Sequence, residues 1–576
     1  MVVRALQYKL IGNNDTTDII QTVLKHRGID DYSTYLNLNS NNYDDYSNLD
    51  NIHDAVKCFV KHFENKDVIS ILCDTDTDGI CSATIMWKYI KLMDSDYPVY
   101  IITHQKKKSH GLASWDFDIP KNTKLLIIPD AGSNDSGECQ KLINEGISVI
   151  CLDHHMVNNI GENPAIVVNN QSSINFINKD ACGAHVTYCF LRALDDDMWN
   201  DYCENHFIDL VALANIADVM NLKSFGTRAM INYGINNISN KMFKEIIEAQ
   251  DFSMKGIVSP FTIAFYVSPL INAFLRSATF EERELLVRAF CEDESETFEY
   301  TKRGESFPVE ESIYEHCVRI AKSYQGKQNR SKDKAVNMIM KHIDQYTDDK
   351  VIIIDVTETL DSAFTGLVAI KISESANKPV LLVRDTQDDY SGSGRAFNYC
   401  PIEDFRALVD ECPESTLAQG HNSAFGCTIK DIDKAKEWFN EKLKNVSFEK
   451  IYNVDFVVDA EDMQANWCHE LDKHKTTFAN GVEEPLWTIR NLHISNSNTK
   501  IVGKNLDTIQ IYDAETNVKY IMFKCDESNE VFNWINNNWD ESEIDINIIG
   551  TLGLNEYQGI YTPNVIIKDC ELVKEG

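Results

Sequence analysis

The most constraining feature of the chain is an apolar run, residues 68–73, that leads directly into three aspartates spaced two apart. A short, continuous apolar run is typical of a strand buried on both faces of a parallel sheet. Because side chains two apart on an extended chain point the same way, Asp74, Asp76 and Asp78 are predicted to aim at one spot. Carboxylates that close raise one another's pKa, and a hard divalent cation would relieve the repulsion. The run therefore predicts a metal site at a strand end.

Three further apolar stretches deliver the same kinds of side chain: residues 125–129 lead to Asp130, residues 148–152 to Asp153, His154 and His155, and residues 210–217 to Asp218. A neutral imidazole beside carboxylates suits a borderline metal such as manganese. Neighbouring side chains diverge, so one histidine is expected on metal and the other facing substrate. The candidate ligands exceed what one ion needs, which predicts two ions roughly 3.5–4 Å apart, an arrangement suited to phosphoryl displacement.

Two simpler interpretations compete with this metal site. The pattern D-x-D-x-D-G also begins a calcium-binding EF-hand loop, but the twelfth position counted from Asp74 is Ile85 instead of glutamate, and the preceding run is strand-like. A solvated acidic turn would explain the three aspartates alone, although it leaves the other three elements unexplained. The sequence contains no P-loop, G-x-S-x-G or H-E-x-x-H motif, so the NTPase, serine hydrolase and zincin interpretations lack their signatures.

Composition sets further bounds. At 576 residues the chain exceeds what one core supports, so several domains are expected. Its formal charge of −34 usually argues against a polyanion as a partner. A local basic groove would still allow one to bind, and bound metal would cancel part of the negative charge. The 16 cysteines are scattered with no C-x-x-C pair, which indicates reduced thiols and a cytoplasmic protein. We also expect no signal peptide and no membrane span, because no apolar run is long enough.

Hydrophobic patterning predicts an α/β multidomain protein whose parts follow one another along the chain. Strand-like runs alternate with helical patterns first, which indicates a parallel sheet, and the last 125 or so residues are rich in β-type runs with turn signals. The predicted segments are an N-terminal extension (1–60), a parallel-sheet catalytic domain (61–235), a helical connector (236–345), a second α/β domain (346–447) and a C-terminal β-barrel (448–576).

The acidic and histidine motifs resemble those of the DHH phosphoesterase superfamily, and within it the RecJ-type single-strand exonucleases. Four motifs carry the resemblance, at residues 73–79, 127–130, 152–155 and 216–219. Weaker similarities extend it over nearly the whole chain: residues 26–29, residues 269–273 with Arg276, residues 392–396, residues 420–421 with Ala424 and Gly426, and residues 554–559. The resemblance implies a DHH domain, a DHH-associated second domain and an OB-like nucleic-acid-binding domain at the end.

By this resemblance two Mn²⁺ ions, with Mg²⁺ as the alternative, are held by Asp76, Asp78, Asp130, His154 and Asp218. Asp130 would bridge the two ions, and Asp74 would be a further ligand. His155 would meet the scissile phosphate and Asp153 would orient its neighbours, so the expected catalytic residues are Asp130, Asp153 and His155. The expected substrate contacts are Arg276, Gly394, Arg395, His421, Lys106 and Lys371. A surface salt bridge is the alternative role for each arginine.

Some positions depart from the family pattern. Lysines at 106–108 stand where the family usually carries an arginine, which keeps the charge but loses bidentate geometry. Lys371 replaces a second usual arginine, and Asn169-Asn170 replaces an Asn-Pro pair. These changes concern strand affinity and end recognition more than chemistry. For residues 106–108 a solvated loop remains the alternative.

The resemblance implies an exodeoxyribonuclease that hydrolyses single-stranded DNA to mononucleotides with 5′→3′ polarity, in DNA recombination and repair. The alternative is a DHH-type oligoribonuclease or cyclic-dinucleotide phosphodiesterase, whose members resemble only the first two α/β domains. A third class is a non-catalytic scaffold, which would have lost metal ligands. The expected partners are single-stranded DNA, stacked on aromatics such as Tyr557 and Tyr561, and a single-strand-binding protein that would deliver it to an acidic chain.

Overall fold

The chain divides into two units in the computed structural model, which describes residues 6–106, 109–302, 304–526, 529–537 and 543–573. The parallel-sheet unit comprises residues 27–326 and 476–483. The C-terminal unit comprises residues 1–26, 327–475 and 484–576. None of the described helices is both long and apolar enough to cross a lipid bilayer.

The core of the parallel-sheet unit is one five-stranded sheet in which all the neighbouring strands run parallel. The strand order is β3-β2-β4-β5-β6, with bounds β2 Val68–Cys73, β3 Val99–Thr103, β4 Thr123–Pro129, β5 Ser148–Asp153 and β6 Ile166–Asn169. The chain leaves β2 for β3 on one side and then returns to β4 on the other. The carboxyl ends of β2 and β4 therefore flank the switch point, where open α/β sheets bind ligands.

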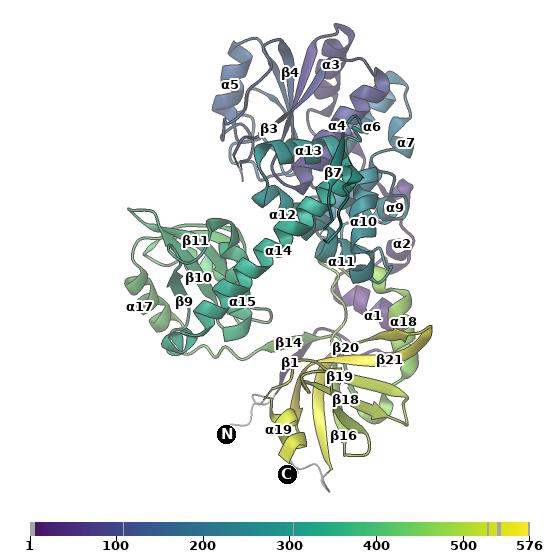
Figure 1. Cartoon of the computed structure of the whole chain (residues 1–576), viewed down its shortest axis with the longest axis vertical. Coiled ribbons are helices and arrows are strands. Elements are labelled where there is room, and N and C mark those ends of the chain that lie inside the picture. The colour runs from purple at the N-terminus through teal and green to yellow at the C-terminus, as the bar shows by residue number, and fades with distance from the viewer. Residues whose placement is uncertain (1–5, 107–108, 303, 527–528, 538–542, 574–576) are drawn as a thin grey trace. The chain divides into compact units, whose positions relative to one another are not determined.

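Both faces of this sheet are buried, which explains why its strands read as continuous apolar runs. Leu72, Leu126 and Val149 pack on one face against Cys139 and Leu142 of α5 (Ser136–Asn144). The remaining helices of the sheet layers are α3 (Ile52–Glu64), α4 (Thr77–Met93) and α6 (Gly183–Met198). Figure 1 shows the sheet flanked by α3 and α5.

Helices follow the sheet along the chain, beginning before residue 236 with α8 (Ile208–Ala217) and α9 (Phe225–Asn236). Residues 236–345 are mostly helical, with α10 (Lys241–Met254), α12 (Ser268–Ser277) and α13 (Phe280–Phe290), but they also contain a hairpin. Strands β7 (Thr297–Tyr300) and β8 (Val309–Ser312) form an antiparallel pair. The 28-residue helix α14 (Ile313–Met340) then passes from one unit into the other.

The C-terminal unit contains a second α/β layer with a mixed sheet of order β12-β13-β11-β10-β9. Its strands are β9 (Ile352–Asp355), β10 (Val380–Asp385), β11 (Tyr390–Arg395), β12 (Ser415–His421) and β13 (Ala424–Ile429). Only the β9–β10 pair is parallel, and the other neighbours are antiparallel. The accompanying helices are α15 (Thr365–Ala376), α16 (Phe405–Asp410) and α17 (Ile432–Lys442).

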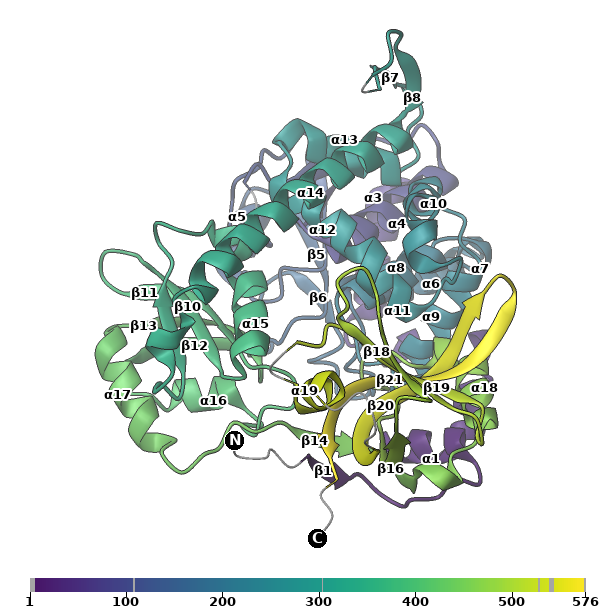
Figure 2. The same ribbon diagram turned by 60° about the horizontal axis from the view of Figure 1, so that its bottom comes forward.

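The end of the chain forms a seven-stranded sheet of order β15-β16-β20-β21-β19-β18-β17, which agrees with the predicted β-rich domain. Its strands are β15 (Phe456–Asp459), β16 (Trp487–Ile494), β17 (Thr499–Val502), β18 (Thr508–Asp513), β19 (Val518–Met522), β20 (Ile544–Tyr557) and β21 (Ile560–Leu572). Figure 2 shows β20 and β21 as one long hairpin, in yellow. Helices α18 (Ala465–Lys473) and α19 (Glu530–Asn537) accompany this sheet.

The N-terminal residues are shared between the two units, a feature that the sequence pattern does not reveal. Strand β1 (Gln7–Leu10) pairs in parallel with β14 (Ile451–Val454). At the end of α1 (Ile19–His26), Nδ1 of His26 lies 3.0 Å from Oδ1 of the buried Asp455. Residues 1–26 thus belong with the C-terminal unit, whereas residues 27–60 belong with the parallel-sheet unit.

A short segment from the C-terminal part of the chain also belongs to the parallel-sheet unit. Residues 476–483, between α18 and β16, belong to it, and we call them the clamp loop. The Asn480 side-chain amide donates to the carbonyls of Val219 and Met220, at 2.6 and 3.2 Å, and Leu222 N–H donates back to the Asn480 carbonyl at 3.0 Å. Arg228 holds the start of the clamp loop through the Thr476 carbonyl, at 2.8 Å. The clamp loop therefore fixes the chain immediately after Asp218.

Candidate metal centre

The acidic run after β2 is built differently from the extended strand that its spacing predicts. Strand β2 ends at Cys73 and helix α4 begins at Thr77, so Asp76 is the N-cap residue and Asp78 lies in the first helical turn. The Asp76 carboxylate accepts the Gly79 N–H at 2.8 Å, the usual capping bond. Asp76 and Asp78 are therefore positioned by the start of a helix, and the three aspartates do not lie on one continuous strand.

Asp78 is held in place by the start of another helix. The N–H groups of Gly183 and Ala184, at the beginning of α6, donate to its two oxygens at 2.6 and 2.8 Å. Backbone N–H groups at a helix N-terminus are suitable donors to a carboxylate. The two bonds fix the Asp78 side chain where α4 and α6 begin.

Asp130 lies at the centre of the site, and its side chain is buried. It follows β4 in a left-handed conformation, with φ 70°, and is 1% exposed. Among the residues that the structure describes, none donates a hydrogen bond to either of its carboxylate oxygens. Burial, followed by the charges of Asp78 and Asp76, raises its pKa well above the ordinary value. Burying a carboxylate without hydrogen bonds costs free energy unless a cation lies beside it.

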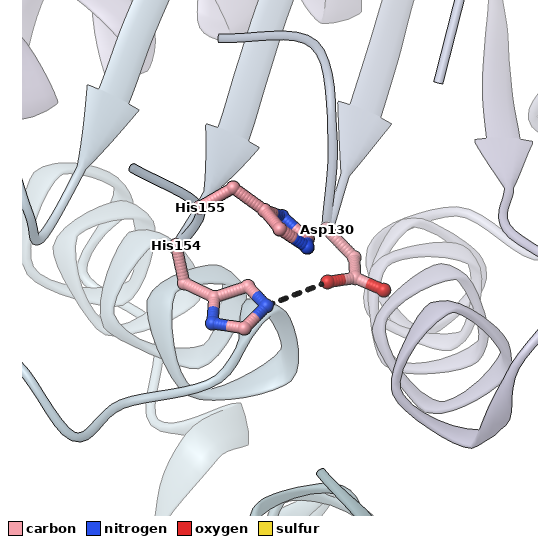
Figure 3. A group of neighbouring side chains, drawn as sticks. All are labelled: Asp130, His154 and His155. Atoms are coloured by element: carbon pink, nitrogen blue, oxygen red, sulfur yellow. Dashed lines mark ion pairs between the residues drawn. The ribbon is translucent and has the colours of Figure 1, made fainter. Parts of the chain in front are cut away.

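His154 lies among three carboxylates, and Figure 3 shows its ion pair with Asp130. Its Nε2 lies 3.2 Å from Oδ1 of Asp130, 3.6 Å from Oδ2 of Asp218 and 3.8 Å from Oδ2 of Asp78. Burial lowers the pKa of this imidazole, which favours the neutral form that binds metals. The site contains two groups of potential ligand atoms, and within each group the atoms lie within 4.8 Å of one another. One group comes from Asp130, His154 and His155, and the other from Asp78, His154 and Asp218.

Asp218 reaches the site from the end of α8, where it is the residue that follows the last helical position. Its side chain is 38% exposed and so is accessible from solvent. Loss of hydration raises its pKa to about 8, and the charges of Asp78 and Asp76 act in the same direction. The pKa of Asp76 is raised to about 6 for the same reasons, desolvation first and the charge of Asp78 next.

These observations fit a divalent metal site. Carboxylates from three elements crowd together with raised pKa values, and a neutral imidazole lies among them. The two oxygens of Asp130 are buried and accept no hydrogen bond within the described part of the chain. Mixed carboxylate and imidazole ligands suit manganese, and carboxylates also suit magnesium.

Gly183 allows Asp130 to approach α6, which leads to a first prediction. A Cβ atom at position 183 would lie 2.5 Å from Cβ and 2.6 Å from Cα of Asp130, closer than packed atoms allow. Gly183→Ala should therefore displace Asp130 and lower turnover by roughly 100-fold, the typical cost of a misplacement of about 1 Å. Turnover and bound manganese would be measured on the purified variant.

The matched control for this substitution is Gly137→Ala in α5. A Cβ atom at position 137 meets nothing within 4 Å, so this variant should keep full turnover and gain a little helix stability. Wild-type turnover in Gly183→Ala, with Asp130 still able to bind metal, would contradict the importance of this contact.

Asp153 and His155 form a separate buried pair beside the metal centre. Asp153 is 1% exposed and accepts the His155 Nδ1 at 2.8 Å, together with the backbone N–H groups of Ser133, His154 and His155. These bonds outweigh the effect of burial and hold the pKa of Asp153 well below its ordinary value. Burial lowers the pKa of His155, but the bond to Asp153 outweighs it and the net change is upward. The Nε2 atom of His155, whose side chain is 43% exposed, is left for other contacts.

Asp74 contacts two histidines, His104 and His110, that were not among the predicted site residues. Its carboxylate pairs with Nε2 of the fully buried His104 at 3.2 Å, accepts the Gly111 N–H at 2.9 Å and forms an ion pair with Nδ1 of His110. His104 in turn places its Nδ1 2.6 Å from Oδ1 of Asp116. Desolvation lowers the pKa of His110, but Asp74 outweighs it and raises that pKa to about 9. Asp74 is therefore bonded on the side of the β3 loop and lies outside both groups of ligand atoms.

The predicted substrate contacts fall in different parts of the structure. Arg276, in the last turn of α12, is half-buried, and the Asp76 carboxylate acts on it, opposing the effect of burial that lowers its pKa. The same helix contacts the acidic loop through Asn272, whose Oδ1 accepts the Thr77 hydroxyl at 3.2 Å. Lys106 is exposed, and its backbone N–H donates to the Asp116 carboxylate at 2.7 Å, while residues 107 and 108 lie outside the described residues.

The other predicted contacts belong to the C-terminal unit. Arg395, at the end of β11, donates through Nη1 to the carbonyls of Gly394 and Phe425, at 2.6 and 3.3 Å. Lys371, on α15, forms an ion pair with Asp333 at 2.7 Å. His421 is exposed at the end of β12. The roles of these four residues toward substrate remain predictions.

Comparisons with known proteins agree with this architecture. The family descriptions "DHH family, N-terminal domain" and "RecJ OB domain" match residues 68–215 and 454–569. The chain is 35% identical to a putative SPbeta prophage-derived single-strand DNA-specific exonuclease, YorK, of Bacillus subtilis, over 99% of both chains. It is 22% identical to the single-stranded-DNA-specific exonuclease RecJ of Bacillus subtilis, over 96% of this chain and 68% of that one.

A solved structure supports the fold assignment. The crystal structure of RecJ in complex with Mn²⁺ from Thermus thermophilus superposes with a TM-score of 0.72 at 18% identity, covering 97% of this chain and 76% of that chain. A second structure of RecJ from the same organism, in complex with Mg²⁺, gives a TM-score of 0.67 at 16% identity over 97% and 75% of the two chains. With the DHH and OB regions in the same order and a relative of matching length, the chain belongs to the RecJ-type branch of the DHH family.

Proposed function

We propose that the chain is a metal-dependent exonuclease that hydrolyses the phosphodiester bonds of single-stranded DNA. The observation that carries the proposal is Asp130, a buried carboxylate that accepts no hydrogen bond in the described structure and lies beside His154 and near the charges of Asp78 and Asp76. A bound cation would stabilise that arrangement, and the YorK and RecJ relatives are named as exonucleases specific for single-stranded DNA.

The ligands that we propose for two divalent cations are Asp78, Asp130, His154 and Asp218, which belong to the two groups of ligand atoms, together with Asp76, which lies outside both groups and caps α4. We propose Asp130 as the ligand that both cations would share. Mn²⁺ is our first choice and Mg²⁺ the alternative, since RecJ structures with either ion share this fold. When bound, the cations would supply an activated water and neutralise charge on the phosphate. Asp74, whose oxygens already bond to His104, Gly111 and His110, is better suited to anchoring histidines than to metal binding.

The chain's own residues would act on the phosphodiester from two sides. Asp153 fixes the His155 ring through Nδ1, so that Nε2 can contact a non-bridging oxygen on which charge must be stabilised during displacement. Arg276 lies close enough to Asp76 for their charges to interact, a position from which a guanidinium can bind phosphate. The product would leave the site on the side where the Asp218 and His155 side chains are exposed to solvent.

We extend the proposal to finer properties of the RecJ type: 5′→3′ polarity, release of mononucleotides, a role in recombination and repair, and delivery of substrate by a single-strand-binding protein. A cytoplasmic location would suit the sixteen cysteines, all of which are unpaired thiols in the structure. The competing oligoribonuclease or cyclic-dinucleotide activity is less favoured, because the match to the RecJ OB domain adds a strand-binding region.

The test uses the full-length protein with Mn²⁺ and oligonucleotides that differ in length, sugar and blocked end. Degradation of single-stranded DNA to mononucleotides, stopped by EDTA and restored by Mn²⁺, would support the proposal. Full activity in EDTA would contradict it. Preferential cleavage of di- and trinucleotides of RNA, with long DNA untouched, would favour the alternative function.

A second prediction concerns strand affinity and the β20–β21 hairpin. Tyr561 is 53% exposed on β21, whereas the side chain of Tyr557 lies outside the described part of the structure. If Tyr561 stacks on a base, Tyr561→Ala should weaken the binding of a long strand by roughly 5- to 150-fold, since a stacked base contributes about 1–3 kcal/mol. Cleavage of a short oligonucleotide should be unchanged. Dissociation constants and turnover would be measured on both substrates.

The matched control is Tyr561→Phe, which keeps the ring and should bind the long strand like wild type. Equal losses on long and short substrates would show instead that Tyr561 is structural. A point substitution is preferable to truncation near residue 450, because truncation would also remove the clamp loop and the partner of β1.

A further inference from the structure

Two exposed imidazoles lie beside the metal centre and are held in the same way. Nδ1 of His155 lies 2.8 Å from Oδ1 of Asp153, and Nδ1 of His110 forms an ion pair with Oδ2 of Asp74. Their side chains are 43% and 49% exposed, and their ring centroids are 4.6 Å apart. In each ring, Nε2 is the polar atom that the carboxylate leaves available. His110 thus duplicates the arrangement of His155.

The support behind His110 is more extensive than an exposed histidine needs for packing. Asp74 is 3% exposed and is itself oriented by His104 and by the Gly111 N–H. His104 is fully buried and is held from its other side by Asp116. Asp116 also accepts the Ser109 hydroxyl at 2.8 Å, which fixes the residue next to His110. A chain of buried charged and polar groups therefore ends at one solvent-facing ring.

Metal binding does not account for this arrangement. His110 belongs to neither group of potential ligand atoms found among the described residues, although the His110 ring contacts that of His155. An imidazolium carries a proton on each ring nitrogen, so a ring that donates from Nδ1 to a buried carboxylate can also donate from Nε2 to an anion. The anion that the proposed function brings to this place is a phosphodiester.

We propose that His110 is a second phosphate-binding residue of the active site, which contacts the scissile phosphodiester through Nε2 beside His155. The inference rests on the proposed function and adds a residue to it. A phosphodiester has two non-bridging oxygens, and two neighbouring rings can each bind one of them. Charge on both oxygens must be stabilised during in-line displacement, so the two contacts act together in the transition state.

Replacing His110 tests this role by separating catalysis from structure. His110→Ala should lower kcat on single-stranded DNA by roughly 100-fold, the typical loss for one donor to a developing anion. His110→Gln should recover part of that loss, because its amide can still donate. His206→Ala is the control, because the exposed His206 ring bonds the Tyr202 carbonyl on another part of the unit. Bound manganese and melting temperature should match wild type in all three variants.

Stereospecific sulfur substitution identifies the contact itself. Wild type should cleave the two phosphorothioate diastereomers of the scissile bond at different rates, and His110→Ala should lose discrimination against one isomer. Wild-type kcat with unchanged discrimination in His110→Ala would overturn the inference. Loss of manganese from that variant would also overturn it, since His110 would then be a ligand.

Titration with inorganic phosphate keeps the inference separate from the proposed function. Calorimetry of the manganese-loaded protein should show that His110→Ala binds phosphate at least about tenfold more weakly than wild type. If wild type leaves single-stranded DNA intact, the proposed function fails, but the phosphate titration still decides whether His110 binds the anion. Equal phosphate affinity in the two proteins would overturn the role of His110 even in an active nuclease.

Discussion

Asp130→Ala is expected to abolish hydrolysis, with a loss of turnover of roughly 10⁴-fold or more, as for other residues on which a whole catalytic group depends. Asp130 is the buried carboxylate nearest to His154, and its two oxygens accept no hydrogen bond in the described structure, so its removal takes a proposed ligand from the centre of the site. Manganese content, turnover and melting temperature would be measured together. The exposed Asp118, in the same unit, provides the control Asp118→Ala, which should behave as wild type.

The fold should survive the loss of Asp130. In EDTA at neutral pH the wild-type protein keeps an unpartnered carboxyl in a buried place, and burial raises its pKa. The unfavourable environment disappears in the alanine variant, which should therefore melt no lower than wild type without metal. Global unfolding of Asp130→Ala at 25 °C would show that the carboxylate has a structural role, and turnover near wild type would show that the metal centre lies elsewhere.

Substitution of the two adjacent histidines is expected to give opposite signatures. His154→Ala should lose manganese, because its Nε2 faces Asp130, Asp218 and Asp78 at 3.2–3.8 Å. His155→Ala should keep manganese but lose roughly 100- to 1,000-fold in turnover, or about 2.7–4 kcal/mol, since it removes one donor to the phosphate oxygens. Bound manganese, turnover and melting temperature, measured on both variants, separate the two roles.

The geometry also allows a competing assignment that this experiment decides. His155 has a ring nitrogen within 4.8 Å of ligand atoms of Asp130 and His154. If His155→Ala loses manganese and His154→Ala keeps it, the two roles are reversed. A drop in melting temperature with nearly intact turnover per folded molecule would show that His155 only packs.

Much of the fold and of the metal centre could be predicted because the signals are local. Each of these apolar runs coincides with a strand or a helix, and parallel strands bring their carboxyl ends to one edge of the sheet. Asp130 and His154, which directly follow β4 and β5, therefore come together, and Asp153 at the end of β5 lies beside them. The acidic run after β2 was placed correctly at this edge, but its geometry was wrong. The Gly79 N–H donates to the Asp76 carboxylate at the beginning of a helix, whereas the spacing had suggested an extended strand.

The histidines around Asp74 could not be predicted from their spacing. His104 and His110 are 30 and 36 positions beyond Asp74 in the sequence, and no repeat or motif connects them to it. They meet Asp74 because β3 pairs with β2, so that the loop after β3 returns over the acidic run. The pairing of these strands depends on the packing of the whole sheet, a tertiary effect that short-range patterns do not encode.

The sequence by itself determined which residues could bind a metal and which runs would carry them to a sheet edge, because both depend on neighbours in the chain. Only the tertiary structure decided that residues 1–26 join the C-terminal unit and that the clamp loop returns to the parallel-sheet unit. Asn480 then holds the carbonyls of Val219 and Met220, next to Asp218, across some 260 positions of sequence. Such a contact consists of backbone carbonyls, which every residue has, and so it leaves no recognisable pattern in the sequence.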